Sequence, residues 1–156
     1  YIYGAIMGLS LASILLVYTG ASVARAFFIT AGAFAGLSLY GYSTKRSLSA
    51  MGSFMIIGLF GLIIASIVNI FMASTQMEFV ISVGGVLIFA GLTAWDTQRI
   101  KSMYMAGDSR EVAAKKSIFG ALTLYLDFIN MFLFIFIKFI FIIIVMIFQY
   151  KILTFY

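Results

Sequence analysis

Residues 85–104 read GVLIFAGLTAWDTQRIKSMY, an apolar run that contains one acidic residue, Asp96, and ends among basic residues. A second segment of this kind, GALTLYLDFINMF at 120–132, contains Asp127. Neither run alternates apolar and polar residues with period two, so each predicts a helix and not a strand. An ionisable group inside a bilayer is costly and usually serves a function. The two aspartates are therefore the first candidates for a functional site.

The composition of the whole chain indicates a membrane protein. Hydrophobic residues make up 64% of it and charged residues 10%, with a mean hydropathy of +1.17. Soluble domains usually have about 45–50% apolar and about 25% charged residues. Cysteine and histidine are both absent, which excludes disulfides, thiolate metal sites and the side chain that usually titrates near neutral pH. We predict an all-α, multi-pass transmembrane bundle whose partner is the lipid bilayer and not a nucleic acid.

Five apolar segments predict five membrane helices. They lie at 3–19, 26–42, 51–73, 78–98 and 117–137. Together they predict a helix bundle over 1–137, followed by an apolar C-terminal tail of atypical sequence at 138–156. A continuous helix from 117 to 150 would be about 51 Å long, beyond a hydrocarbon core of about 30 Å. The tail is expected to be a poorly constrained terminus, with an added membrane-anchoring segment as the alternative.

The distribution of lysine and arginine predicts the orientation, because cytoplasmic loops carry an excess of both. The loops at 43–50 and 99–116 and their flanks are expected on the cytoplasmic side, and the other loops contain only Arg25. The cytoplasmic set is Lys45, Arg46, Arg99, Lys101, Arg110, Lys115 and Lys116. We therefore expect a protein of the bacterial inner membrane with these two loops in the cytoplasm.

Small residues recur every four positions in three of the segments. The rows are Gly4, Gly8 and Ala12; Gly32 and Gly36; and Ala90 and Ala94. Such rows let helix backbones approach closely in lipid. We expect close packing within one bundle, with dimerisation through these faces as the alternative.

Each aspartate lies on a narrow stripe of small or polar residues, because residues three and four apart share a helix face. Gly120, Thr123 and Asn130 share the stripe of Asp127, and Thr93 lies one turn before Asp96. A third stripe, on the helix at 51–73, contains Asn69. We predict that the three stripes face one another around a polar interior.

This arrangement predicts a proton-sensitive pair. Burial penalises the charged form of a carboxyl group, and a carboxylate nearby penalises it further. Asp96 and Asp127 are therefore expected to share a proton and titrate as a unit. When ionised, they offer hard oxygen ligands for a weak, transient calcium site. The alternatives are an ion pair of Asp96 with Arg99 or Lys101, and a purely structural, hydrogen-bonded Asp127.

Four strings of the chain are similar to those of a known family. The chain resembles the Bax inhibitor-1 family (the transmembrane BAX inhibitor motif-containing family), particularly its bacterial members. The strings are AGAFAGLSLYGYSTKRSLSAMGSF (31–54), GLFGLIIASIVNIF (58–71), GVLIFAGLTAWDTQRIKSMY (85–104) and GALTLYLDFINMF (120–132). The resemblance implies a bundle of seven helices with the last one central. It also implies that Asp96 and Asp127 form a di-aspartyl pH sensor that gates a passive calcium leak, and it links the chain to cytoprotection.

The chain would then contain five of the seven helices, the third to the seventh. The resemblance places the first two, with a basic residue that latches the sensor, ahead of Tyr1, so we expect a fragment that lacks its N-terminal part. The alternative function is a membrane scaffold or regulator that binds proteases or transporters in a stress response. We expect no enzymatic activity and no cofactor, because the sequence contains no nucleophile–base pair, phosphate loop or metal-ligand cluster.

Overall fold

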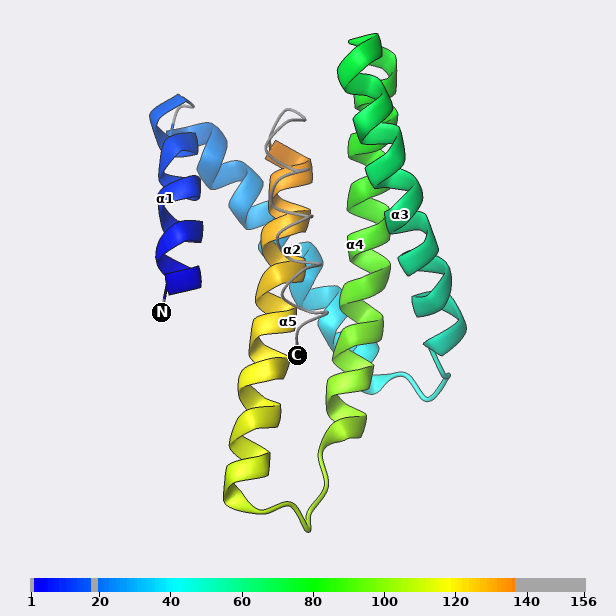
Figure 1. The fold of residues 1–156 in the computed structure, drawn as a ribbon. Coiled ribbons are helices and arrows are strands. Elements are labelled where there is room, and N and C mark those ends of the chain that lie inside the picture. The colour runs from blue at the N-terminus through cyan, green and yellow to red at the C-terminus, as the bar shows by residue number, and fades with distance from the viewer. Residues whose placement is uncertain (1, 18–19, 137–156) are drawn as a thin grey trace.

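The computed structural model describes residues 2–17 and 20–136, which form a bundle of helices (Figure 1). The helices are α1 (Ile2–Val17), α2 (Gly20–Ser43), α3 (Ser49–Met72), α4 (Thr75–Met103) and α5 (Arg110–Phe136). The predicted all-α class and the five helices are thus confirmed. The predicted tail at 138–156 lies outside the described residues.

The two predicted loops on the basic side are shorter than expected. The segment expected as a loop at 99–116 is helical except for 104–109, because α4 continues to Met103 and α5 begins at Arg110. Hydropathy marks the part of a helix that lies in the bilayer, whereas the hydrogen-bonded helix continues into polar sequence. An i,i+4 ion pair between Glu111 and Lys115, 2.8 Å apart, supports the first turns of α5 in that region.

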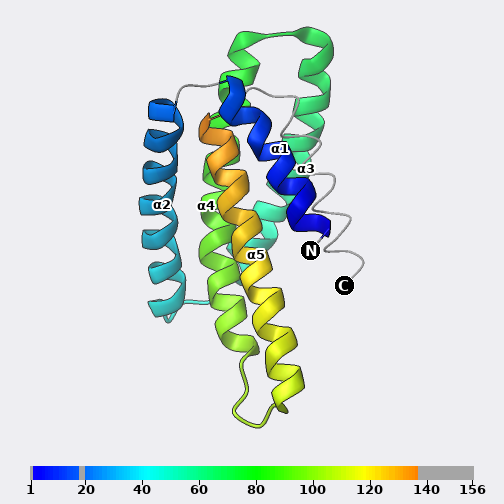
Figure 2. The ribbon, with the colours of Figure 1, turned by 90° about the vertical axis from the view of Figure 1, so that its left-hand side faces the viewer.

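Helices α4 and α5 form an antiparallel pair at the centre of the bundle. Helix α2 packs on both of them and α3 packs on α4 (Figures 1 and 2). Every position from 129 to 134 in α5 is buried. A helical segment that is buried on all sides lies in the interior of a bundle. The central position of the last described helix agrees with the expectation from the resemblance.

Glycines allow the closest approaches between these helices. Gly41 of α2 lies directly against the carbonyl of Ala94, and Gly52 of α3 lies against the ring of Trp95. The side chain of Met55 of α3 packs against Gly91 of α4. A side chain at any of these glycines would displace its neighbour. The glycines therefore let α2 and α3 each approach α4 closely.

The rows of small residues predicted for close packing are only partly used. Ala94 is buried, and Gly41 packs against it. Among the residues that the structure describes, none comes within 4 Å of a Cβ placed on Gly4, Gly8, Gly32 or Gly36. The prediction of close packing is therefore wrong for these four glycines. Spacing in one helix does not show whether a neighbour covers the face.

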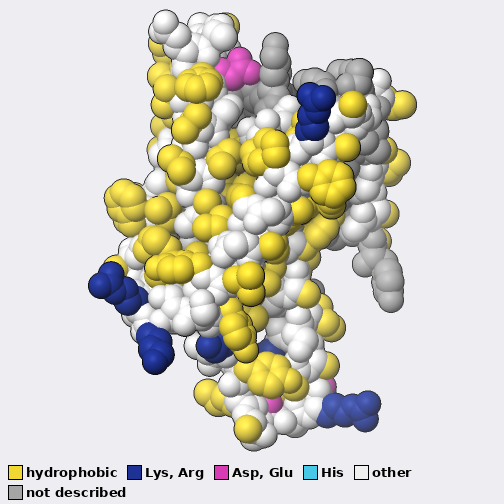
Figure 3. Space-filling view, turned by 180° about the vertical axis from the view of Figure 1, so that it is seen from behind, with side chains coloured by type: hydrophobic (Ala, Val, Ile, Leu, Met, Phe, Trp, Pro, Cys, Tyr) yellow, Lys and Arg dark blue, Asp and Glu magenta, His cyan; other side chains and the backbone are white. Residues whose placement is uncertain are grey.

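The outer surface of the bundle fits a bilayer. Four described helices are long and apolar enough to cross one: Val23–Ser43, Ser49–Met72, Thr75–Met103 and Arg110–Phe136. Large apolar side chains stand exposed along them, including Phe54 at 68% and Phe71 at 85%. Lysine and arginine gather at the end of the molecule that contains the 44–48 and 104–109 connections (Figure 3). The bundle is thus an integral, multi-pass membrane protein.

A lysine ties the connection between α4 and α5 together. Lys116 Nζ donates to Met103 O at 2.8 Å and forms an ion pair with Asp108 Oδ2 at 2.6 Å. It therefore links the last turn of α4, the loop and the first turns of α5. The hydrogen bond from Lys116 holds the pKa of Asp108 below its ordinary value.

This lowered pKa predicts how the stability of the helical hairpin formed by α4, the 104–109 connection and α5 depends on pH. The ionised Asp108 stabilises the folded state above the unfolded pKa of about 3.9, and that contribution is lost as the pH falls through the lower folded value. We expect Asp108→Asn to lower the melting temperature in detergent at pH 7 but to match the wild type once the wild-type carboxyl group is protonated. Melting curves between pH 7 and pH 2 measure this. Equal melting temperatures at pH 7 would contradict the role of the ion pair.

Candidate functional site

The two aspartates singled out in the sequence meet between the central helices. Asp96 of α4 is 7% exposed and Asp127 of α5 is 6% exposed. Their carboxyl groups lie close enough to interact directly. An ionised carboxylate can only accept hydrogen bonds, so a hydrogen bond between the two requires a proton on one of them. The structure therefore brings the two predicted carboxyl groups together across the α4–α5 interface.

Few other groups in the interior compensate the charge of the pair. Asp127 Oδ2 is buried and accepts no hydrogen bond from an N–H or hydroxyl group of the described residues. Three polar side chains of the two stripes donate to carbonyl groups of their own helices: Thr93 to Phe89 O, Thr123 to Phe119 O and Asn130 Nδ2 to Leu126 O. The carboxyl group of Asp96 is the charged group that interacts directly with Asp127.

The packing of α4 on α5 brings the two predicted stripes face to face. Ile100 of α4 contacts Gly120 of α5, and Phe134 of α5 lies against Gly85 of α4. These contacts fix an antiparallel register in which Asp96 is level with the turn of α5 that contains Thr123 and Asp127. All members of the two stripes at this level are buried: Thr93, Asp96, Thr123, Asp127 and Asn130. The stripes thus form a continuous polar strip inside an apolar interface.

The basic residues near Asp96 are engaged elsewhere. The guanidinium of Arg99 lies 5.4 Å from the centre of the Trp95 ring. Lys101 Nζ donates to Tyr42 O at 2.7 Å and lies over the ring of that tyrosine. The salt bridges of the described helices join Lys115 to Glu111 and Lys116 to Asp108, and none includes Asp96. No salt bridge of the described residues therefore joins Asp96 to Arg99 or Lys101, although the positive charge of Arg99 still acts on Asp96 from a longer distance.

Asn69 does not belong to the same interior. Its Oδ1 accepts a hydrogen bond from Ser74 N at 3.0 Å and its carbonyl accepts one from Ala73 N, so it closes the turn from α3 to α4. Ala73 has a φ of 47°, the left-handed conformation that ends many helices. Asp96 lies about 32 Å further along α4 than Thr75. The prediction that Asn69 shares the polar interior is wrong, because a helix face does not reveal depth in the bilayer.

Gln98 is a polar residue that the sequence analysis missed. It accepts from Leu48 N at 2.8 Å through Oε1 and donates from Nε2 to Arg46 O at 2.7 Å. Gln98 therefore fixes the α2–α3 connection to α4 about half a turn from Asp96. Gln98 lies four residues after Ala94 and therefore on the same face of α4, the face that packs on α2 through Ala94. This shared face is the signal that could have identified Gln98.

A comparison with known families identifies the chain. Residues 1–142 match the family described as "Inhibitor of apoptosis-promoting Bax1". The chain belongs to the Bax inhibitor-1 family. The match includes both aspartates and all the described helices, so the resemblance inferred from the four strings is confirmed.

Bacterial relatives support membership in the Bax inhibitor-1 family. The chain is 53% identical to an uncharacterized protein of Rickettsia prowazekii over 135 residues, which is 86% of the chain and 57% of that relative. An uncharacterized protein of Caulobacter vibrioides is 54% identical over 132 residues, 83% of the chain and 52% of the relative. Inner membrane protein YbhL of Escherichia coli is 49% identical over 134 residues, 85% of the chain and 57% of YbhL. The predicted inner-membrane location agrees with YbhL. The chain spans little more than half of the length of these relatives.

Proposed function

We propose that this protein is a proton-sensitive ion conduit, in the simplest form a passive calcium leak, with Asp96 and Asp127 as its sensor. The observation that supports the proposal is the direct proximity of two buried carboxyl groups that come from different membrane helices. Two carboxyl groups placed in this way attract one another when they share a proton and repel one another when both are ionised, so the contact between α4 and α5 is expected to depend on protonation.

Loss of the shared proton changes the site in two ways. Two adjacent negative charges repel one another strongly in a medium of low dielectric constant, so the helices separate or a cation enters. Calcium prefers carboxylate, carbonyl and water oxygens. The described residues contain no cluster of three or more acidic, cysteine or histidine ligands, so Asp96 and Asp127 are expected to hold calcium weakly, with water and backbone carbonyls completing its shell. A weak site suits an ion that must leave again.

Calcium flux measured as a function of pH tests the proposal. The protein is reconstituted into liposomes that contain a calcium dye, and flux is compared with protein-free liposomes between pH 5 and pH 8. We expect protein-dependent flux that changes with pH, because protons and calcium compete for the same carboxyl oxygens. Flux equal to that of empty liposomes at every pH would refute the proposed function.

A membrane scaffold is a second candidate. Its supporting observation is that no described residue covers Gly4, Gly8, Gly32 or Gly36, where another membrane helix would pack closely. Crosslinking in native membranes followed by purification distinguishes it from the conduit. A specific protein partner that remains bound after loss of both aspartates, without measurable flux, would favour the scaffold. Failure to recover a specific partner would count against it.

A further inference from the structure

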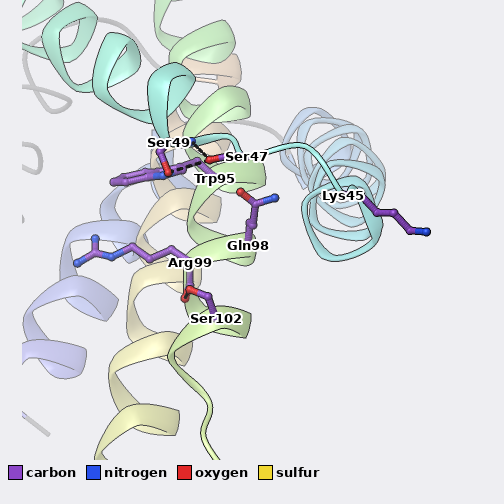
Figure 4. Close-up of a pocket in the computed structure, with 7 residues that line it drawn as sticks. All are labelled: Lys45, Ser47, Ser49, Trp95, Gln98, Arg99 and Ser102. Carbon is purple, nitrogen blue, oxygen red and sulfur yellow. Dashed lines mark hydrogen bonds between the residues drawn. The ribbon is translucent and has the colours of Figure 1, made fainter.

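A pocket of about 530 Å³ lies on the basic side of the bundle, where the α2–α3 connection meets α4. Its walls come from that connection, from the first residue of α3 and from the last third of α4 (Figure 4). The lining residues are Lys45, Ser47, Ser49, Trp95, Gln98, Arg99 and Ser102. The pocket therefore lies at the end of the membrane-spanning part of α4, at the depth of lipid headgroups.

Hydrogen bonds fix the walls of this pocket. Gln98 bridges the α2–α3 connection through Leu48 N and Arg46 O. Ser47 and Ser49 are hydrogen-bonded to each other, with Oγ atoms 3.2 Å apart, next to the ring of Trp95 (Figure 4). Trp95 packs on Gly52, which sets the position of its ring. The pocket is part of the folded structure and not a gap between loose loops.

The lining of the pocket is basic, and the nearest carboxylate on which one of its cations acts is the buried Asp96, behind Arg99. Lys45 and Arg99 line it, and no acidic residue does. Asp108 and Glu111, the acidic residues of the neighbouring connection and first turn, are paired with Lys116 and Lys115. Figure 4 shows Lys45 at the outer rim, directed away from Gln98, and Arg99 on the side of Trp95. Two cations from different elements thus lie on opposite sides of a polar hollow, with their side chains directed away from each other (Figure 4), and no carboxylate of the described residues lines that hollow.

We propose that this pocket binds the phosphate group of an anionic ligand. Guanidinium, ammonium and serine hydroxyl groups are the side chains that bind phosphate oxygens. Basic pockets between helices on the cytoplasmic side of a membrane bind anionic lipid headgroups. The same chemistry recognises a free phosphate. The volume exceeds what a phosphate group alone needs, which leaves room for the rest of a headgroup.

The single tryptophan of the chain makes this proposal directly testable, because Trp95 lines the pocket. Its fluorescence is recorded in nanodiscs of phosphatidylcholine to which phosphatidylglycerol is added, and separately with inorganic phosphate in solution. We expect a saturable change with one of the two, weakened by sodium chloride because the contact is electrostatic. A response to phosphatidylglycerol identifies a lipid site, and a response to inorganic phosphate identifies a soluble anion.

Two pairs of substitutions locate the response. Lys45→Gln with Arg99→Gln removes both cations of the pocket and is expected to weaken binding about 30-fold, the effect of about 1 kcal/mol for each basic residue. Arg110→Gln with Lys115→Gln removes the same charge from the same side outside the pocket and is expected to leave binding within about twofold. Lys45→Gln alone leaves the Arg99–Trp95 contact in place and is expected to weaken binding about fivefold. No response to either ligand, or an equal loss in both double variants, would overturn the proposal.

Discussion

Replacing both Asp96 and Asp127 by asparagine is expected to remove the pH dependence of calcium flux. Asparagine has nearly the shape of a protonated aspartate and cannot ionise. The double variant should therefore show, at every pH, the flux that the wild type shows at its acidic limit. Each single variant should keep a pH response over a shifted range, because the remaining carboxyl group is still buried but titrates without its neighbour. Flux in proteoliposomes between pH 5 and pH 8 measures the effect.

Asp108→Asn is the matched control for this experiment. Asp108 lies outside the membrane-spanning helices and is paired with Lys116, so its loss should leave the pH response of the flux unchanged. A pH response that persists in the Asp96→Asn Asp127→Asn double variant would show that the sensor lies elsewhere. A response lost equally in the control would point to general damage to the hairpin.

Gly41→Ala is expected to destabilise the bundle strongly. A Cβ at this position overlaps the carbonyl group of Ala94, a backbone group that cannot rotate away. Overpacking of this kind typically costs about 1–3 kcal/mol, enough to lower the melting temperature by several degrees. Because α2 packs on both central helices, the substitution also disturbs the interface that holds the aspartates. Thermal unfolding in detergent measures the loss.

Gly36→Ala supplies the control on the same helix. A Cβ there meets nothing within 4 Å, and alanine favours a helix over glycine by about 0.5–1 kcal/mol. We expect this variant to be as stable as the wild type or more so. Equal destabilisation by the two substitutions would show that the contact of Gly41 with Ala94 is unimportant.

The sequence predicted the parts of the site that depend on helical periodicity. Asp127, Thr123 and Asn130 share a stripe at spacings of three and four, and Asp96 with Thr93 does the same, so their burial on facing sides of α4 and α5 follows from the pattern. Contact between the two carboxyl groups required the register of the helices. That register depends on Gly85 and Gly120, whose partners lie far away in sequence.

Other features depend on tertiary packing that local sequence does not encode. Asn69 shares the face pattern of the site residues, yet it caps a turn at the opposite end of α4. Gly41 and Gly52 make the close approaches although neither belongs to a four-residue row, whereas Gly32 and Gly36 belong to one and stand open. The pocket of Lys45 and Arg99 also joins elements about 50 residues apart, so spacing gave no sign of it.

The shared proton is the central claim, and infrared spectroscopy of the carboxyl groups tests it most directly. A protonated carboxyl group gives a C=O stretching band distinct from that of a carboxylate. At pH 7 the wild type should show such a band, which disappears in the Asp96→Asn Asp127→Asn double variant and persists in Asp108→Asn. Absence of a protonated carboxyl band in the wild type at pH 7 would contradict the account.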